Sequence, residues 1–379
     1  MSPVSTNTNG TGNSAHHDSD AALPPSLSFK CAVTDSKGPR RSMEDAHAIV
    51  VPFAGVRGQA FFAIFDGHAG KQAAEWCGAN FSTCFLEAIK RDPTATIPDA
   101  FNQTFHDVDG HLSQLSEESD GKMHAGCTAV TAFLRLEDAD GKQSFLPPHF
   151  DPIDIALADM HLDDEASDGE AEGGHEKVSN RARIKQFFKP ANHDQSSPPP
   201  SQASSANTNE KDNAWTLPRN ATVRRVLYCA NVGDARGVLC RAGRAVRLTY
   251  DHKGSDKQEA KRIMDAGGFV MSGRVNGVLA VTRSLGDSSM KEFVVGAPYT
   301  TETELSEEDE FLILACDGLW DVIDDQKACE LVRSIADPRR AAEELLDYAY
   351  KNYSTDNVTV LVVRLRSPPE AMGTEQNGS

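Results

Sequence analysis

The chain has 379 residues, with 38 Lys and Arg against 56 Asp and Glu, and a net charge of −18. This length allows one large domain or two small ones, and so acidic a chain is a poor candidate for binding nucleic acid or an anionic membrane through its overall charge. No run approaches 18 apolar residues and the eight cysteines include no C-x-x-C pair, so we expect no membrane segment and a reducing compartment, cytoplasmic and nuclear.

Residues 1–27 are rich in Ser, Thr, Asn, Gly and Asp, and we interpret them as a flexible tail because they contain too little apolar surface to fold. A strand is expected from Ser28 and a second over residues 48–53, A-I-V-V-P-F. Between them lies R-R-S-M-E-D-A-H. On its own this motif favours a solvated ion pair over the alternative, a phosphate-binding Arg40 beside a metal-binding Glu44.

Residues 61–70, F-F-A-I-F-D-G-H-A-G, are the stretch around which we expect the rest of the chain to be organised. An apolar run of strand length ends at Asp66 and is followed by glycine and His68. Taken singly, a strand followed by a polar turn explains this pattern equally well. The same construction recurs over residues 227–234 and 311–318, where an apolar run again leads to an aspartate beside glycine. The repetition favours an acidic site at the ends of strands.

Two helices are predicted after this turn. Residues 71–91 and 99–115 carry apolar side chains at helical spacing, which is typical of helices that pack on a sheet. Residues 126–134, G-C-T-A-V-T-A-F-L, return to a strand pattern.

Residues 137–222 interrupt this pattern. They contain an acidic stretch without Lys or Arg over residues 151–176, two proline clusters and long Ser, Asn and Gln runs. We favour a solvated, disordered insert. Two segments within it stay open as partner-binding sequences: the apolar and acidic residues 150–162 and the basic and apolar residues 181–189.

Ordered structure is expected to resume at residue 225. Residues 225–247 predict three strands joined by two turns. The remaining elements are a short helix over residues 257–266, two helices over 325–335 and 338–351, and a last strand over 356–363, before a tail from Ser367. Strands joined by tight turns, with helices arriving in pairs, favour an α+β fold with antiparallel sheets.

Seven acids fall at strand ends and turns: Glu44, Asp45, Asp66, Asp234, Asp317, Asp321 and Asp356. Massed carboxylates repel one another unless a cation lies among them. A ligand set of oxygens, without His or Cys at metal spacing, favours Mg²⁺ or Mn²⁺ over zinc. Such a set can hold two ions that activate a water for in-line attack on a phosphoryl group, without a phosphoenzyme. The Gly67 carbonyl is a further candidate ligand, Arg40 a candidate phosphate-binding group and His68 a candidate general acid.

Together, seven motifs resemble those of the metal-dependent type 2C protein phosphatases. They are R-x-x-M-E-D from Arg40, D-G-H-A-G from Asp66, G-C-T-A from Gly126, N-V-G-D-A-R from Asn231, L-A-V-T-R-S-L-G-D from Leu279, L-A-C-D-G-L-W-D from Leu314 and D-N-V-T-V from Asp356. Their order and spacing match over most of residues 28–366, apart from the insert. Flanking sequences such as R-L-T-Y-D-H-K and L-W-D-V-I-D-D-Q are most similar to the fungal members that dephosphorylate stress-activated MAP kinases.

The resemblance implies an αββα sandwich of two antiparallel sheets flanked by helices, and removal of phosphate from phosphoserine and phosphothreonine. The phosphatase domain would span residues 28–366 around the 137–222 insert, with a tail over 367–379. The implied metal-binding positions are Asp66 for both ions, Asp317 and Asp356 for the first, Glu44 and the Gly67 carbonyl for the second, Asp45 for bound waters, and Asp234 and Asp321 with Asp317 for a weaker third ion. Arg40 would bind phosphate and His68 would be the general acid.

The resemblance also implies a monomer that acts on phosphoproteins, MAP kinases among them, as a negative regulator of kinase signalling. The insert replaces a tight connection usual in the family, so partner choice and a regulatory partner for the insert stay open. Two rival hypotheses remain. A two-metal nuclease or other phosphodiesterase would need a basic groove, which the charge disfavours. A catalytically dead binding module would have lost metal ligands, whereas none of the seven acids is substituted.

Overall fold

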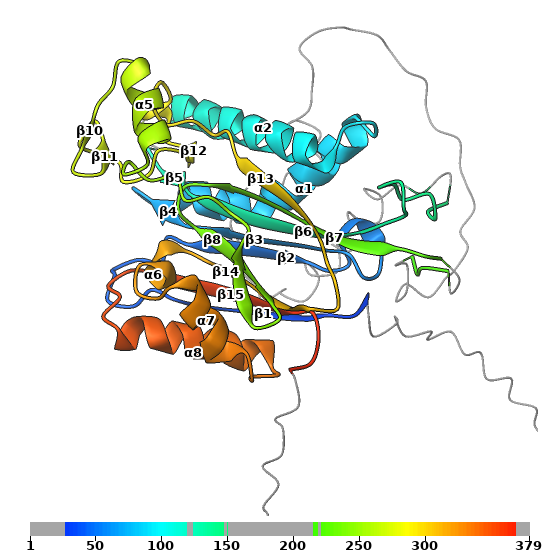
Figure 1. Ribbon diagram of the computed structural model, residues 1–379. Helices are drawn as coiled ribbons and strands as arrows, with labels where there is room; N and C mark the ends of the chain where they lie inside the picture. Colours follow the sequence, from blue (N-terminus) through cyan, green and yellow to red (C-terminus); the bar gives the residue numbers. More distant parts are fainter. Residues whose placement is uncertain (1–26, 120–123, 148–149, 151–214, 219–220, 369–379) are drawn as a thin grey trace, which may run out of the picture.

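The computed structural model describes residues 27–119, 124–147, 150, 215–218 and 221–368 (Figure 1). Two five-stranded antiparallel sheets pack face to face, and helices cover their outer faces. This arrangement confirms the predicted αββα sandwich. Each sheet buries both faces, which explains why most of its strands are continuous apolar runs.

The first sheet has the strand order β13-β7-β6-β3-β2. Its strands are β2 (Ala46–Val50), β3 (Ala60–Phe65), β6 (Ala129–Glu137), β7 (Arg224–Val232) and β13 (Tyr299–Glu304). Helices α1 (Gln72–Arg91) and α2 (Ile97–Glu118) cover its outer face. Because side chains alternate along a strand, Phe61 and Phe65 of β3 pack against Phe81 of α1.

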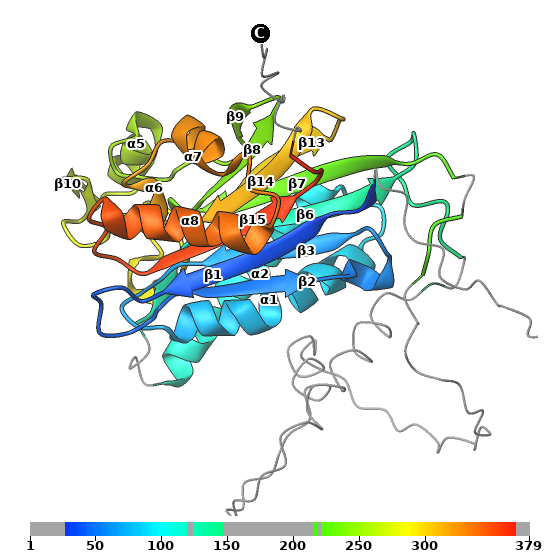
Figure 2. The same cartoon turned by 90° about the horizontal axis from the view of Figure 1, so that it is seen from below.

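The second sheet has the order β1-β15-β14-β8-β9. Its strands are β1 (Lys30–Ser36), β8 (Arg236–Arg241), β9 (Arg244–Arg247), β14 (Asp309–Ala315) and β15 (Val358–Arg364). Helices α6 (Asp317–Trp320), α7 (Asp325–Val332) and α8 (Pro338–Lys351) lie on its outer side (Figure 2). Helix α8 begins as predicted, because the Asp337 side chain accepts a hydrogen bond from the Arg339 amide and Pro338 occupies the first turn.

The inner faces of the two sheets form a separate apolar core. Phe62 and Ile64 of β3 belong to it, together with Leu312 and Leu314 of β14 and Leu361 of β15. The residues between them in the sequence belong to two other apolar cores, each of which lies between one sheet and the helices that cover it. The period of two in these strands therefore fixes which side chains meet between the sheets and which meet the helices.

Smaller elements lie at one end of the sandwich. Strands β4 (Gly67–His68), β5 (Gly126–Cys127) and β12 (Leu285–Gly286) form a three-stranded sheet. Helix α5 (Lys257–Asp265) and the pair β10 (Val270–Met271) and β11 (Arg274–Val275) project beside it (Figure 1). Short 3₁₀ helices occupy Phe53–Gly55 and Ser288–Met290. Among the described residues, no helix is both long enough and apolar enough to cross a bilayer.

Two element predictions need correction. The strand expected over residues 48–53 is β2, Ala46–Val50, and the chain then leaves the sheet at Pro52, which has no amide hydrogen to donate. Strand β13 was not predicted. Its sequence, Y-T-T-E-T-E, is polar because it lies at the edge of the first sheet, where no residue is fully buried.

Only the two ends of the 137–222 insert lie within the described residues. Its ends meet, because the rings of Phe145 and Trp215 stack with centroids 5.5 Å apart. The Trp215 amide donates to the Gly55 carbonyl at 2.8 Å, and the Arg57 amide donates to the Trp215 carbonyl at 3.0 Å. Of the two candidate partner-binding segments, all but Phe150 lie outside the described residues, as do the tails apart from Leu27, Ser367 and Pro368.

Candidate metal centre

A cavity of about 280 Å³ opens at the end of the sandwich that carries β4, β5 and β12. Eight of the ten predicted site residues line it: Arg40, Glu44, Asp66, Gly67, His68, Asp234, Asp317 and Asp356. A larger cavity of about 460 Å³, between Phe29 and Arg364, contains none of them. The site residues predicted from the sequence therefore gather at the smaller of these two cavities.

Asp66 lies where strand β3 ends, as the apolar run of its sequence predicted. Its backbone carbonyl accepts a hydrogen bond from the Thr128 amide at 2.9 Å, which ties β3 to β5 and β6. Burial raises the pKa of its carboxyl group well above the usual range, and the neighbouring Asp317 and Asp45 raise it further. The following residue must be glycine, since a Cβ atom on Gly67 would lie 2.2 Å from the Glu44 carbonyl oxygen.

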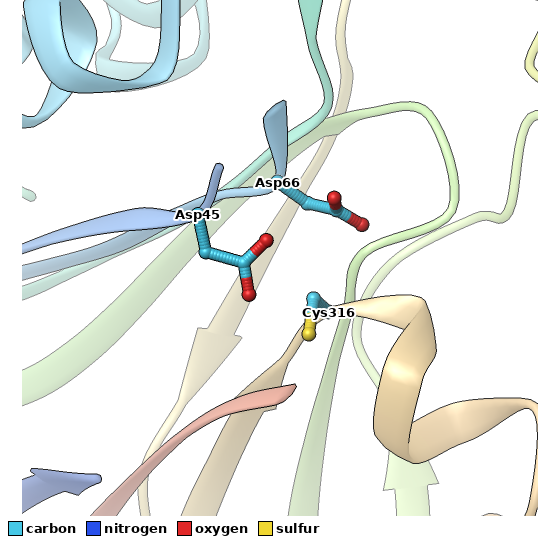
Figure 3. Close-up of side chains that lie close together, drawn as sticks. All are labelled: Asp45, Asp66 and Cys316. Atoms are coloured by element: carbon cyan, nitrogen blue, oxygen red, sulfur yellow. The ribbon is translucent and has the colours of Figure 1, made fainter. Parts of the chain in front are cut away.

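Asp45 lies beside Asp66, below the lining of the cavity. Oxygens of the two carboxylates and the Cys316 sulfur all lie within 4.8 Å of one another (Figure 3). Thr359 donates to Oδ2 of Asp45 at 2.7 Å, whereas Oδ1 is buried and has no hydrogen-bond partner among the described residues. Burial is also the main cause that raises the pKa of Asp45.

Cys316 is a neighbour of the site that the sequence did not single out, although it directly precedes Asp317. Burial raises the pKa of its thiol well above the usual range, and Asp45 and Asp66 add to the effect. The thiol therefore stays protonated, because a thiolate beside these carboxylates would be repelled. The donor set of the cavity consists of oxygen atoms.

Glu44 and Asp356 come from opposite ends of the chain. The Glu44 amide donates to the side chain of Asn357 at 2.8 Å, and the Gly70 amide donates to Oε2 of Glu44 at 3.2 Å. Arg40 forms an ion pair with Asp356, with Nη2 2.6 Å from Oδ2. Asn357, which follows Asp356 in the D-N-V-T-V motif, thus joins two halves of the site that lie 313 residues apart.

Asp234 and Asp317 also line the cavity. Burial raises the pKa of Asp317 to about 8, helped by repulsion from Asp234 and Asp321. Lys253, which the sequence analysis did not assign to the site, places its Nζ 3.2 Å from Oδ2 of Asp234 and 3.1 Å from Oδ1 of Asp321. Asp321 does not line the cavity and is mostly exposed.

His68 lines the cavity from strand β4. Its Nε2 lies 2.7 Å from Oδ2 of Asp287. Asp287 ends the motif L-A-V-T-R-S-L-G-D, but its contact with His68 depends on a strand register that the sequence does not reveal.

These residues fit divalent metal ions. The buried Oδ1 atoms of Asp45 and Asp234 both lack a hydrogen-bond partner among the described residues, which is costly unless a cation is near. The pKa values of Asp66 and Asp317 are raised first by burial and then by the neighbouring carboxylates, and a bound cation would relieve both effects. Hard cations prefer such oxygen donors.

A helix-flanked pair of antiparallel sheets with an acidic cavity at one end is the arrangement that comparisons with known proteins can identify. The family model described as Protein phosphatase 2C matches residues 29–139 and 171–358. Protein phosphatase 2C homolog 1 from Saccharomyces cerevisiae is 39% identical over 346 residues, which cover 90% of this chain and 95% of that protein. The protein of the same description from Schizosaccharomyces pombe is 36% identical over 331 residues, 87% of this chain and 71% of that protein.

The chain therefore belongs to the protein phosphatase 2C family, and it is a protein phosphatase of the serine/threonine class. Solved structures share its fold. A Caenorhabditis elegans sex determining protein superposes with a TM-score of 0.62 at 23% identity and covers 90% of this chain and 65% of that one. A phosphatase from Toxoplasma gondii superposes with a TM-score of 0.58 at 22% identity, over 90% and 95% of the two chains.

Proposed function

We propose that this chain hydrolyses phosphoserine and phosphothreonine in proteins with two Mg²⁺ or Mn²⁺ ions and without a phosphoenzyme. The observation that carries the proposal is the convergence of Glu44, Asp66, Asp234, Asp317 and Asp356 on one cavity. When bound there, the ions supply an activated water and offset the charge of the phosphate.

The proposed metal-binding residues are those that the motifs predicted. Asp66 would serve both ions, Asp317 and Asp356 would hold the first, and Glu44 with the Gly67 carbonyl would hold the second. Asp45, buried behind Asp66, holds bound waters. Asp234 and Asp321, together with Asp317, form a weaker third position. The unpartnered oxygens of Asp45 and Asp234 support this assignment.

Two further side chains act on the substrate. Arg40 lies at the mouth of the cavity with 55% of its side chain exposed, so its guanidinium can exchange Asp356 for the phosphate oxygens. His68 gives a proton to the serine or threonine oxygen as it leaves. An alkoxide is a poor leaving group, and this proton makes its departure possible.

Phosphate release from a phosphothreonine peptide tests the proposal. We expect release with Mn²⁺ or Mg²⁺, none in EDTA, and a loss of about a hundredfold or more in Asp66→Asn. Asp265→Asn is the matched control, because this exposed acid pairs with Lys261 on α5 and does not line the cavity, and it should stay within about twofold of wild type. Release in EDTA, or an unchanged Asp66→Asn, would contradict the metal centre.

For the physiological substrate we propose a stress-activated MAP kinase, and for the chain a role as negative regulator of that pathway. The support is the similarity of the flanking sequences to the fungal members that act on such kinases. A kinase phosphorylated on both threonine and tyrosine should lose only the threonine phosphate, as followed by mass spectrometry. Retention of this phosphate by an enzyme that hydrolyses the peptide would refute the assignment.

We also propose that the insert selects the protein partner, and that the chain works as a monomer in the cytoplasm and nucleus. The ends of the insert meet at Phe145 and Trp215, so a short Gly-Ser linker can replace residues 151–214. Peptide hydrolysis should be unchanged by this replacement, and kinase dephosphorylation should fall about tenfold. Equal rates on the kinase would assign the insert another role. Light scattering and imaging of the tagged chain test the other two points.

A further inference from the structure

We propose that Asp287 is a positioning residue, which holds the His68 imidazole in the orientation and tautomer needed for proton transfer to the leaving group. The inference rests on the proposed function, in which His68 is the general acid. Oδ2 of Asp287 lies 2.7 Å from Nε2 of His68. His68 lines the cavity with 26% of its side chain exposed, whereas Asp287 does not line it and is 8% exposed. Asp287 therefore acts on the substrate only through His68.

The three-stranded sheet brings this pair together. In its register His68 of β4 lies opposite Gly126 of β5, and Gly126 lies opposite Gly286 of β12. Asp287 follows Gly286 and reaches back across β5 to the histidine. The space it crosses exists because Gly126 has no side chain, since a Cβ atom there would lie 2.3 Å from Oδ2 of Asp287.

The carboxylate of Asp287 is fixed from several sides. Its backbone adopts the left-handed conformation, with φ 49° and ψ 43°, which an aspartate or asparagine tolerates better than most residues. Ser284 Oγ donates to the same Oδ2 atom at 2.5 Å. These restraints hold the carboxylate in one place, which a side chain in a flexible loop could not do.

Helix α2 anchors the loop from the other side. Oδ1 of Asp109 accepts a hydrogen bond from the Gly286 amide at 2.9 Å and lies 2.6 Å from Nζ of Lys291. Lys291 also donates to the Ser284 carbonyl at 3.2 Å. The residues on both sides of Asp287 are thus tied to the rigid first layer of the sandwich.

This arrangement decides which nitrogen of His68 transfers the proton. A carboxylate accepts from Nε2–H, so Nδ1 is the nitrogen that serves the substrate. In the imidazolium, which carries a proton on each ring nitrogen, the Nδ1 proton moves to the serine or threonine oxygen as the bond between that oxygen and phosphorus breaks, and the neutral Nε2–H tautomer remains, still hydrogen-bonded to Asp287. The attacking water forms the new bond to phosphorus, and the imidazole regains a proton from solvent.

The kcat values for two substrates distinguish a positioning role of Asp287 from a purely structural one. A phosphothreonine peptide needs a proton on its leaving oxygen, whereas p-nitrophenyl phosphate does not, because nitrophenolate leaves readily. In Asp287→Asn, which keeps the left-handed backbone, we expect kcat for the peptide to fall about tenfold to a hundredfold. We expect kcat for p-nitrophenyl phosphate to stay within about threefold. His68→Ala and the double variant His68→Ala with Asp287→Asn should have equal peptide rates, with Asp265→Asn as control.

A second measurement does not depend on turnover. In the protein held in EDTA, at a pH where the ring is neutral, the ring signals of His68, identified by their absence in His68→Ala, should show the Nε2–H tautomer in wild type and a mixture in Asp287→Asn. Equal losses on both substrates, additive effects in the double variant, or an unchanged tautomer would overturn the inference while leaving the phosphatase assignment intact. A wild type inactive on both substrates would overturn the proposed function and this inference together.

Discussion

Burial raises the pKa of the Asp317 carboxyl group to about 8, and the nearby Asp234, Asp321 and Asp356 add to the effect. An aspartate in an unfolded chain titrates near pH 4. Between these two values the folded, metal-free protein holds a proton that the unfolded chain has released. Its stability is therefore greatest at the acid end of this range and decreases as the pH rises.

In EDTA we expect the free energy of unfolding to fall between pH 6 and pH 8, by at most about 1.4 kcal/mol per pH unit for this one group. Urea unfolding at several pH values measures it. Asp317→Asn should show a shallower slope. Saturating Mg²⁺ should flatten the slope of the wild type, because metal-bound carboxylates stay ionised. A stability that rises with pH in EDTA would contradict this account of the site.

Lys253 is the second residue whose role depends on the metal. Burial opposes its charge, yet Asp234 and Asp321 raise the pKa of its ammonium group. In Lys253→Met these carboxylates lose a counter-ion, so we expect the melting temperature in EDTA to drop by about 4 °C or more. Mn²⁺ should then raise it further than in wild type. Lys261→Met, which removes an exposed ion pair, is the control; equal responses of the two variants would refute this role of Lys253.

At the scale of elements, Glu259 connects helix α5 to the segment before β12. Arg283 donates to its carboxylate at 2.6 and 3.1 Å, and Thr282 and Arg262 donate at 2.9 and 3.0 Å. Burial alone would raise the pKa of Glu259, but these hydrogen bonds lower it to about 2. One buried carboxylate thus fixes a helix that has only a small apolar core, around Ile263.

Glu259→Gln leaves Arg283 without its charge partner, so α5 should open more easily, by about 3 kcal/mol. Hydrogen exchange of the amides of α5 measures this opening. The exchange of β14, at the centre of the second sheet, should be unchanged. Glu292→Gln, at an exposed position, is the control. Equal protection of α5 in both variants would show that the contacts of the Glu259 carboxylate do not stabilise this helix.

The elements that could be predicted are those whose signals are local. Helix α8 carries its own N-cap and proline, and strand β3 is a run of buried apolar residues. Strand β13 was missed because an edge strand of Thr and Glu has no apolar signal. Lys253 and Asp287 were missed because their partners depend on packing between distant segments, which the sequence alone does not specify.

At the scale of the whole molecule, the sandwich has three apolar layers, and the one under α1 and α2 is rich in aromatic side chains. The rings of Phe85 and Phe101 stack with centroids 4.1 Å apart. Phe85→Ala leaves a cavity there, and we expect it to lower the free energy of unfolding by about 3–5 kcal/mol. Denaturant unfolding checks this value. Phe269→Ala, at an exposed position, should cost about 0.5 kcal/mol or less; a similar loss in both variants would contradict the layered core.

The architecture and most of the site could be predicted because several of the acids stand next to apolar strands, Asp66 after β3 and Asp356 before β15 among them. The pairing within the site could not. Arg40 contacts Asp356, and Asn357 holds Glu44, across more than 300 residues of sequence. These contacts exist only once the two sheets have closed on each other.

Strand β1 pairs along its whole length with β15, the last strand of the fold. During synthesis, β1 therefore cannot pair in the sheet until β15 has been made. Asp356 lies two residues before β15 and reaches the cavity at the same stage. Until then Glu44 lacks Asn357 and Asp66 lacks Asp356, although Asp234 and Asp317 have already been made. Because the proposed first metal position needs Asp356, we expect the nascent phosphatase to stay inactive until translation has passed this carboxylate.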